Sequence, residues 1–474
     1  MEPLPQAIFD FFALSLPRGH GFGDRPPIGA WTDEAWRVCG VVTQDTNDRS
    51  LGVLAIRRRM DDVWVVTAQQ HGFVTLDEAK ARLEALLRIG EPPETLPPNT
   101  APRPALHYLG DRIPSDVFKI LQMPSHHRAA WALNQLYLAL PNPDRNWASD
   151  CQTGNFHTRL WEAQLLAAFR EQGLLVTQPV ESPDFHIQNR RGGEAWVEAV
   201  TANPATPYNH VNAPRSRPPE GREALFFGPT ALRFAKTLGN KLQRSYHEME
   251  HVKGKPFMLA VADFHAPGSM LWSREGLIGY LYGEGAEPAL VNGQRVARRI
   301  PASHLQGPSA FPAGLFADAE FAELSAVIFS NACSIGKLNR VMISAGANPN
   351  GLRYTRTGRF FDRRPGALEG IPFCLDITSD AYRRLWPQGY EPWSAEIEVF
   401  HNPFAKHPVP HALLPEATHW FDDGGERTCS AFYETSVLWS VTHITDADKP
   451  PLRLEDFLGG PSPDPDLQGA PDVG

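Results

Sequence analysis

Three short segments near the amino end alternate between apolar and polar residues and predict β-strands. They are rich in β-branched side chains and occupy residues 36–45, 51–59 and 63–70. A segment over 75–90 follows, in which apolar residues recur at helical spacing between a capping Thr75 and a closing Gly90. We therefore predict a small α+β module over residues 1–91, followed by a proline-rich linker over 92–113.

The middle of the chain predicts one or two helices over 114–140 and then the order α-β-β-β-α-β. The six expected elements are a helix over 156–173, strands over 174–180, 184–188 and 195–202, a helix over 229–249 and a strand over 256–264. Along this stretch the apolar residues change from helical spacing to the alternation of strands and back again, which is typical of an α/β protein. We assign residues 114–265 to one domain, a central mixed sheet flanked by helices, within a multi-domain α+β chain.

Beyond residue 265 the pattern is less regular. A helix is expected over 271–283, and strands are expected over 324–332 and 339–346. The stretch from 350 to 445 is rich in aromatic residues, His and Pro, with little periodicity. We therefore predict an α+β region of unknown fold over 266–458 and a disordered tail over 459–474.

The composition is that of a globular chain. Its 474 residues predict two to four structural units, and its 42% hydrophobic and 21% charged residues lie near the average for soluble proteins. The sequence shows no basic, apolar leader and no run of about 18 apolar residues, so we expect a cytoplasmic protein without membrane contact. The five cysteines lack a C-x-x-C pair and are expected to be reduced. The 17 histidines lack the spacing of a helical zinc motif and are expected to be structural.

The charge is unevenly distributed along the chain. A net charge of -9 argues against a protein that coats nucleic acid through its overall field. Residues 185–260 nevertheless hold eleven Lys and Arg against six Asp and Glu, whereas residues 445–474 hold two basic and seven acidic residues. A basic surface is therefore expected in the central domain.

Three acids lie among apolar neighbours in this central domain. Glu162 shares a predicted helix face with Leu166 and Phe169. Asp184 stands at the start of one short strand, and Glu198 alternates with apolar residues on the next. A buried carboxylate costs several kcal/mol unless it is protonated, paired or bound to a cation. The pattern predicts that the three acids have a specific partner.

A divalent cation would account for the three carboxylates together. Clustered carboxylates repel one another unless positive charge lies between them, and oxygen ligands with room for water suit Mg²⁺ or Mn²⁺. Such an ion lowers the pKa of water and stabilises charge on a phosphoryl oxygen. The chemistry that we predict is hydrolysis of phosphodiester bonds.

Each acid also has a structural interpretation. An acid on a mostly apolar helix face, such as Glu162, is often paired with an Arg or His of the core. Asp184 follows a proline and is compatible with a simple turn residue. Glu198, between apolar neighbours on a strand, is harder to explain in this way. The three acids together favour a functional site.

These residues resemble the PD-(D/E)XK nuclease superfamily, to which many restriction and repair endonucleases belong. The resemblance covers residues 150–265 and rests on Ser-Pro-Asp ending at Asp184, on Glu-Ala-Val beginning at Glu198, and on the order α-β-β-β-α-β. It implies a restriction-endonuclease-like core and a Mg²⁺- or Mn²⁺-dependent endonuclease that acts on DNA, with family association suggesting defence against foreign DNA. It also implies that Asp184 and Glu198 are metal ligands and that Glu162 is the additional acid of the first helix, holding a second metal ion or a metal-bound water.

One position departs from the family pattern. The lysine expected two residues after Glu198 is replaced by Val200. Thr201 lies on the opposite strand face and is not expected to replace that lysine. The following helix offers Lys236 and Lys241, of which Lys241 lies at the edge of the apolar stripe and Lys236 nearly opposite it. We predict that Lys241 is the substitute, the alternative being a solvated lysine whose stem covers the core.

The partners follow from the same assignment. Arg190, Arg191, Arg215 and Arg217 are candidate contacts for phosphate oxygens. A homodimer or a protein partner is compatible with the sequence. Two other functions remain open: an inactive pseudo-nuclease that binds nucleic acid or a protein, and a glycosidase in which Glu162 and Glu198 serve as acid and base in a cleft lined by Trp.

Overall fold

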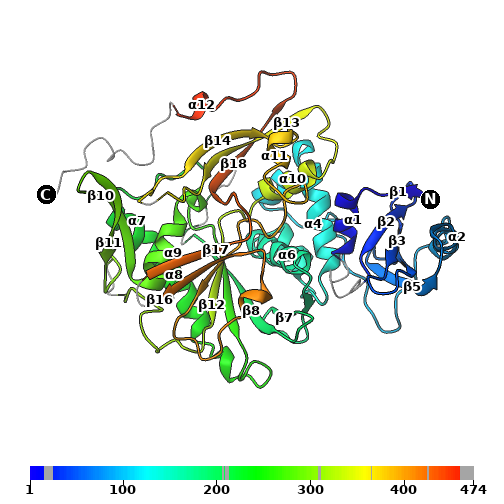
Figure 1. Ribbon diagram of the computed structural model, residues 1–474, viewed down its shortest axis with the longest axis horizontal. Helices are drawn as coiled ribbons and strands as arrows, with labels where there is room; N and C mark the ends of the chain where they lie inside the picture. Colours follow the sequence, from blue (N-terminus) through cyan, green and yellow to red (C-terminus); the bar gives the residue numbers. More distant parts are fainter. Residues whose placement is uncertain are drawn as a thin grey trace.

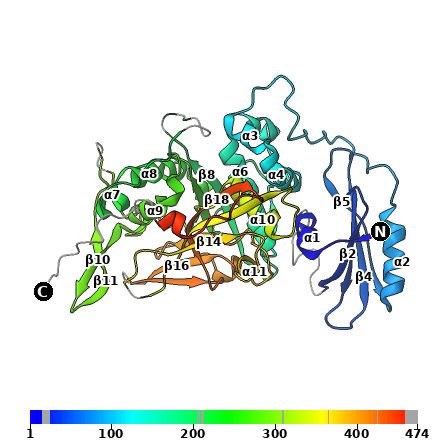
Figure 2. The same ribbon diagram turned by 90° about the horizontal axis from the view of Figure 1, so that it is seen from above.

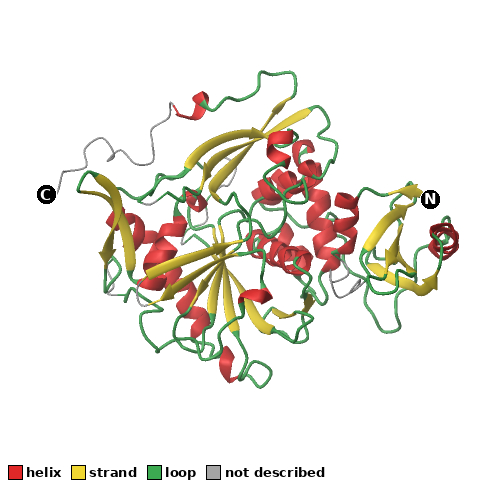
Figure 3. Cartoon of the chain, in the orientation of Figure 1, coloured by secondary structure: helices red, strands yellow, loops and turns green. Residues whose placement is uncertain are grey.

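The computed structural model describes residues 1–14, 25–204, 206, 208, 213–307, 311–364, 366–423 and 426–458. Helices lie on both faces of a large sheet, and a smaller sheet stands apart at the amino-terminal end (Figure 3). No helix within these ranges has the length and apolar character needed to span a bilayer. The mixed α and β class and the mixed central sheet are confirmed. The expected disorder of 459–474 concerns residues outside those described.

The amino-terminal module is a five-stranded antiparallel sheet in the order β1-β2-β3-β4-β5, with a helix on each face (Figure 2). Helix α2 (Leu76–Leu87) begins at Thr75, whose side chain accepts a hydrogen bond from the Glu78 N–H as the sequence predicts. Helix α1 (Gln6–Ala13) was not predicted and packs on the other face. The strands are β1 (Glu2–Pro3), β2 (Pro27–Thr32), β3 (Val38–Gln44), β4 (Leu51–Arg58) and β5 (Trp64–Phe73).

The start of the linker is fixed to this module. The guanidinium of Arg57 is almost fully buried and bonds to the carboxylate of Glu94 at 2.7 Å and to the carbonyl of Pro92 at 2.8 Å. Residues 92–113 contain no helix or extended strand, as their prolines predict. The first residues of the linker therefore lie ordered against the small sheet.

The large sheet has eight strands in the order β17-β16-β15-β12-β9-β8-β7-β6. Strands β6 to β8 form an antiparallel meander, and β8, β9 and β12 run parallel. The predicted division at residue 265 differs from the structure, because strands beyond it continue the same sheet. The strands are β6 (Leu175–Thr177), β7 (Phe185–Gln188), β8 (Glu194–Ala202), β9 (Phe257–Asp263), β12 (Ala326–Ser330), β15 (Glu398–His401), β16 (Thr418–Asp423) and β17 (Glu426–Ala431).

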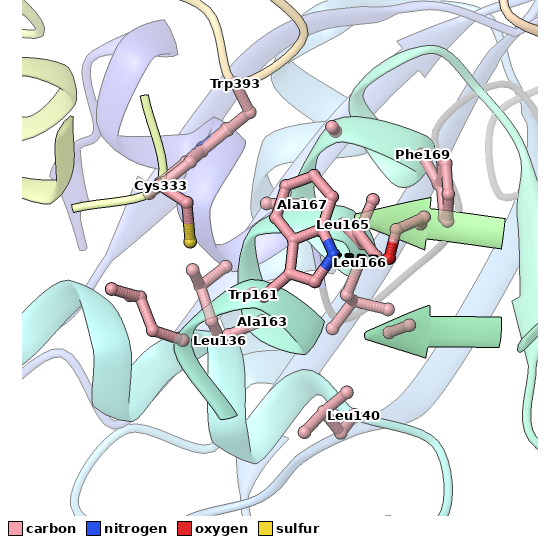
Figure 4. Close-up of a cluster of buried hydrophobic side chains, with 14 of the residues drawn as sticks. Leu136, Leu140, Trp161, Ala163, Leu165, Leu166, Ala167, Phe169, Cys333 and Trp393 are labelled. Carbon is pink, nitrogen blue, oxygen red and sulfur yellow. Dashed lines mark hydrogen bonds between the residues drawn. The ribbon is translucent and has the colours of Figure 1, made fainter. Parts of the chain in front are cut away.

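Helices cover the two faces of this sheet. Helix α6 (Phe156–Glu171) packs on one face together with α4 (His127–Ala139), and α8 (Pro229–Leu242) and α9 (Ser273–Tyr282) pack on the other. Figure 4 shows Trp161 of α6 among apolar side chains, and its indole N–H donates to the Ala260 carbonyl of β9 at 2.9 Å. Alternation along β8 directs Val197 to the α6 face and Val200 to the α8 face.

The predicted strand over 339–346 is wrong, because residues 339–344 belong to helix α10 (Ile335–Ser344) and the last two form a turn. Ser334 caps the helix by accepting the Lys337 N–H at 3.2 Å, and Leu338 and Met342 then face the core at helical spacing. The β-branched residues near its end had suggested a strand, but the cap and the period of the apolar positions determine the structure.

The remaining elements lie around the large sheet (Figure 1). A three-stranded sheet is formed by β13 (Leu352–Phe360), β14 (Ile371–Asp376) and β18 (Val437–Asp446), and β10 (Glu284–Val291) and β11 (Gln294–Pro301) form a hairpin. The short helices are α3 (Asp116–Leu121), α5 (Trp147–Gln152), α7 (Arg222–Phe227), α11 (Asp380–Arg383), α12 (Glu455–Leu458) and the single turns η1 (Pro124–His126), η2 (Tyr246–Glu248), η3 (Ser269–Leu271) and η4 (His411–Leu413).

Two histidines are buried in the carboxyl-terminal strands. His419 Nε2 lies 2.8 Å from the Leu414 carbonyl, so it carries the proton, and His419 Nδ1 then accepts from His401 Nε2 at 2.8 Å. Burial lowers the pKa of His401 to about 3 and that of His419 to about 4, each further lowered by the neighbouring imidazoles. Both rings are therefore neutral in the folded protein.

Because His401 and His419 are neutral in the folded protein, we predict that the fold loses stability in acid. The pKa values of both histidines in the folded protein lie below the unfolded value of about 6.5, so the unfolded state binds more protons. The contribution of this pair to the free energy of unfolding is therefore lost as the pH falls from 6.5 toward 4. We expect the free energy of unfolding to fall by about 2 kcal/mol from this pair between pH 6.5 and 5.5. Urea unfolding at several pH values measures the slope of the free energy of unfolding against pH. It should flatten in His401→Gln and stay unchanged in the exposed control His304→Gln, and an unchanged slope in His401→Gln would contradict the assignment.

Candidate functional site

Asp184 lies where the pairing between β7 and β8 ends. Phe185 pairs with Val197, whereas β8 continues beyond this pair to Ala202. The Asp184 carboxylate accepts the backbone N–H of Ala199 at 2.7 Å. Asp184 thus accepts a backbone N–H of β8 just beyond the last residue pair between β7 and β8. We call this place, where β7 has ended and β8 continues, the notch.

Glu198 lies on β8 beside this notch and faces helix α8. Its side chain is buried, and its Oε1 lies 2.5 Å from the Lys241 ammonium nitrogen in the last turn of α8. Its Oε2 lies 3.5 Å from the Ser182 hydroxyl. Burial, and then the charge of Glu198, raise the pKa of the enclosed Tyr246 phenol. The predicted lysine therefore contacts the predicted carboxylate, whereas Lys236 points outward and lies near the Phe311 ring.

Glu162 is buried on α6 and has two protein partners. Its Oε2 accepts the indole N–H of Trp147 at 2.7 Å, and Arg159 Nη1 binds Oε1 at 2.9 Å and Oε2 at 3.2 Å. The same guanidinium binds Asp150 at 2.6 Å and lies 3.4 Å from Asp144. The pairing with a core arginine, one of the two interpretations of Glu162, is the arrangement found.

The three acids influence one another electrostatically. Burial raises the pKa of Asp184 well above its ordinary value, and the charges of Glu198 and Glu162 raise it further, whereas the Ala199 N–H and Lys241 lower it. Burial also raises the pKa of Glu162, against the lowering effect of Arg159 and Trp147. The sequence-predicted acids and Lys241 are therefore gathered at one place, and positive charge there would stabilise the ionised acids.

Other predicted residues lie elsewhere. Arg190 and Arg191 are exposed in the turn between β7 and β8, which four strand residues separate from Glu198, a distance of roughly 13 Å. Arg215 is exposed beside Gly268, beyond the end of β9, and Arg217 is exposed close to it in sequence. The four arginines do not form one group around the acids.

Two features limit the nuclease interpretation of the site: one concerns the metal ligands and the other the missing lysine. Among the described residues, no group of three or more His, Cys, Asp and Glu is placed to hold a metal ion. Thr201 is on the α6 face, where its hydroxyl lies 2.8 Å from that of Thr158, so it does not replace the missing lysine. Any metal bound here would have two protein carboxylates, Asp184 and Glu198, and would complete its coordination with water or substrate.

Sequence reasoning missed the residues that surround the acids. Arg159 precedes Glu162 by three positions, a spacing at which helix side chains meet, and this signal could have identified the pair. Trp147 and Tyr246 come from separate elements, and no spacing along the chain indicates their position. The partners within one helix were accessible from the sequence, whereas those across elements were not.

One cavity lies away from the acids. It encloses about 40 Å³ between Arg274, Trp386, Trp420 and Glu398. Arg274 there donates to both oxygens of Glu398 at 2.8 and 2.9 Å. The Trp-lined sugar cleft that a glycosidase requires beside Glu162 and Glu198 is thus not supplied by this cavity.

Comparison of the chain with protein-family models, with curated proteins and with solved structures gives no match. The functional argument therefore rests on the site itself. Its central observation is the meeting of Asp184, Glu198 and Lys241 at the notch between β7 and β8.

Proposed function

We propose that this protein is a metal-dependent nuclease that hydrolyses phosphodiester bonds in DNA. The proposal is supported chiefly by one observation: Lys241, from the helix after β8, contacts Glu198, the acid that the sequence pattern assigns to the metal. The adjacent order β6-β7-β8-β9, with an antiparallel meander and then a parallel strand, agrees with the resemblance to PD-(D/E)XK nucleases. The association with defence against foreign DNA belongs to this proposal.

The side chains present fit a hard divalent cation. Asp184 and Glu198 offer only oxygen ligands, and the raised pKa of Asp184 reflects burial and the repulsion that a cation would relieve. Mg²⁺ is usually held by one or two carboxylates together with water and substrate phosphate, so two protein ligands suffice. When bound, Mg²⁺ or Mn²⁺ would supply charge neutralisation at the phosphoryl group and acidification of water.

The protein groups then have distinct roles. Asp184 and Glu198 hold the ion, and the backbone N–H of Ala199 fixes the orientation of the Asp184 carboxylate. Lys241 contacts Glu198, and in the proposed mechanism it would orient the attacking water or donate a hydrogen bond to a phosphate oxygen. The local excess of positive charge in residues 185–260 would attract the DNA backbone, which dominates affinity for nucleic acid.

The testing experiment combines Mn²⁺ titration by calorimetry with cleavage of plasmid and single-stranded DNA. Wild type should bind Mn²⁺ and cleave DNA, and cleavage should stop in EDTA. Lys241→Gln should still bind Mn²⁺ but cleave about 100-fold more slowly, because a positioned proton-transfer group contributes about 10² to 10⁴. Lys236→Gln, on the exposed side of the same helix, serves as the matched control and should behave as wild type.

The outcomes separate the candidate functions. Mn²⁺ binding with no cleavage of either DNA favours the pseudo-nuclease, which binds nucleic acid or a protein without cutting. Absence of Mn²⁺ binding, even with DNA present, would overturn the proposed metal site. Equal rates for Lys241→Gln and Lys236→Gln would contradict the role given to Lys241 without removing the metal ligands.

A further inference from the structure

Arg159 occupies the centre of an acidic group on the α6 side of the proposed site. Its guanidinium bonds to Glu162 and Asp150 and lies 3.4 Å from Asp144. The Arg159 side chain retains 14% of its exposure and that of Glu162 only 7%, so the pair is little screened by solvent. The charges of Glu162 and Asp150 raise the pKa of Arg159, although burial alone would lower it. Arg159 is therefore a permanent cation at this place.

The same contacts occupy the oxygens of Glu162. Oε2 already accepts from Trp147 and Arg159, and Oε1 accepts from Arg159. A metal ion at Glu162 would have to displace charge-assisted hydrogen bonds of 2.7, 2.9 and 3.2 Å, which occupy both carboxylate oxygens. Glu162 is thus poorly placed to act as a metal ligand, in contrast to the role that the family resemblance implies.

Asp184 and Glu198 are held differently. Asp184 has a backbone N–H on one oxygen, and Glu198 has Lys241 on Oε1 and a hydroxyl at 3.5 Å from Oε2. Neither carboxylate is bound by a guanidinium in the hydrogen bonds described for this site. The two halves of the acidic group therefore differ in how their oxygens are occupied: both oxygens of Glu162 accept hydrogen bonds from Arg159, whereas Glu198 has Lys241 on Oε1 only and a distant hydroxyl at Oε2.

We infer that Arg159 takes the place of a second metal ion, so that the site binds one divalent ion through Asp184 and Glu198 alone. This inference rests on the proposed metal-dependent function. Arg159 acts as a positioning residue, because it neutralises Glu162 and leaves the single ion as the exchangeable charge. The consequence is a stoichiometry of one rather than two.

The test counts Mn²⁺ equivalents by calorimetry and native mass spectrometry, without measuring activity. Wild type should bind one equivalent. Glu162→Gln should also bind one, with an affinity within about threefold of wild type, whereas loss of a carboxylate that binds the ion directly would weaken binding at least about tenfold, because affinity depends on the charge of the ligands. Arg159→Met, which frees Glu162 and Asp150 from the guanidinium, should gain a second equivalent. Lys119→Met, which removes an exposed helical ion pair, is the matched control and should bind one.

Each outcome decides the inference. Two equivalents in wild type, a tenfold loss in Glu162→Gln, or a single equivalent in folded Arg159→Met would overturn it. If Arg159→Met does not fold, Glu162→Gln decides alone, because glutamine keeps the size and the acceptor for Trp147. Zero equivalents in wild type instead overturn the proposed function, so the two failures are distinguishable.

Discussion

Replacement of Asp184 by asparagine is expected to abolish Mn²⁺ binding and to slow DNA cleavage about 1,000-fold, equivalent to about 4 kcal/mol of transition-state stabilisation. The amide keeps the shape of the side chain and can still accept the Ala199 N–H, so the strand geometry at the notch should survive. What is lost is one of two anionic oxygen ligands. Calorimetry with Mn²⁺ and single-turnover cleavage of plasmid DNA measure the two effects.

The same change should make the metal-free protein more stable. Burial and the neighbouring acids raise the pKa of Asp184 in the folded state, so the unfolded state releases its proton first as the pH rises. The destabilising effect of the Asp184 carboxylate is absent below its pKa in the unfolded state. It grows as the pH rises from there toward its pKa in the folded state. Asp184→Asn removes that effect, and thermal unfolding at pH 7 should shift upward. The half-exposed Asp116→Asn is the control, and a lower melting temperature for Asp184→Asn would argue for a purely structural aspartate.

Glu391→Gln should destabilise the fold by about 3 to 5 kcal/mol, the usual result of removing one partner from a buried ion network. Glu391 is fully buried and contacts Lys337 at 2.9 Å and Arg340 at 3.0 Å, and the Tyr382 hydroxyl donates to it. Burial would raise its pKa, but Arg340, Lys337 and Arg356 hold the pKa well below its ordinary value. After the change these three cations keep only Glu396 as a carboxylate partner among the residues of this network.

Urea unfolding monitored by tryptophan fluorescence measures this loss. The matched control is Glu369→Gln, which removes a half-exposed partner of Arg359 at 3.6 Å and should cost less than about 1 kcal/mol. A cost of similar size in both variants would show that the buried network contributes no more than a surface pair. Because the depressed pKa of Glu391 keeps it ionised, its contribution should persist through the mildly acidic range and be lost only in strong acid.

The sequence predicted the local elements well and their long-range pairing poorly. Helix α6 and strands β6 to β9 follow directly from the period of their apolar residues. The sheet does not stop at 265, because β12 pairs with β9 across a long insertion, and no local pattern encodes that partner. Helix α1 was missed because apolar residues fill most of its eight positions, which leaves no clear period.

The candidate site shows the same contrast. Helical geometry alone placed Lys241 at the edge of the apolar stripe and Lys236 away from it, and the structure has Lys241 at Glu198. The partner of Glu162 lay on the same helix, three residues earlier, and was still missed, because an arginine at that spacing is common on any helix. Trp147 reaches Glu162 only through the packing of α5 on α6, which the sequence does not express.

The order of strands in the large sheet also has a consequence for biosynthesis. When β9 leaves the ribosome, its outer edge has no neighbour until β12 emerges roughly 60 residues later, which takes about 3 to 12 s at typical translation rates. A further delay of similar length precedes β15. During these intervals the nascent chain presents an apolar strand with unpaired backbone groups, the kind of edge that recruits other chains. The yield of native protein should therefore depend on elongation speed between residues 264 and 400.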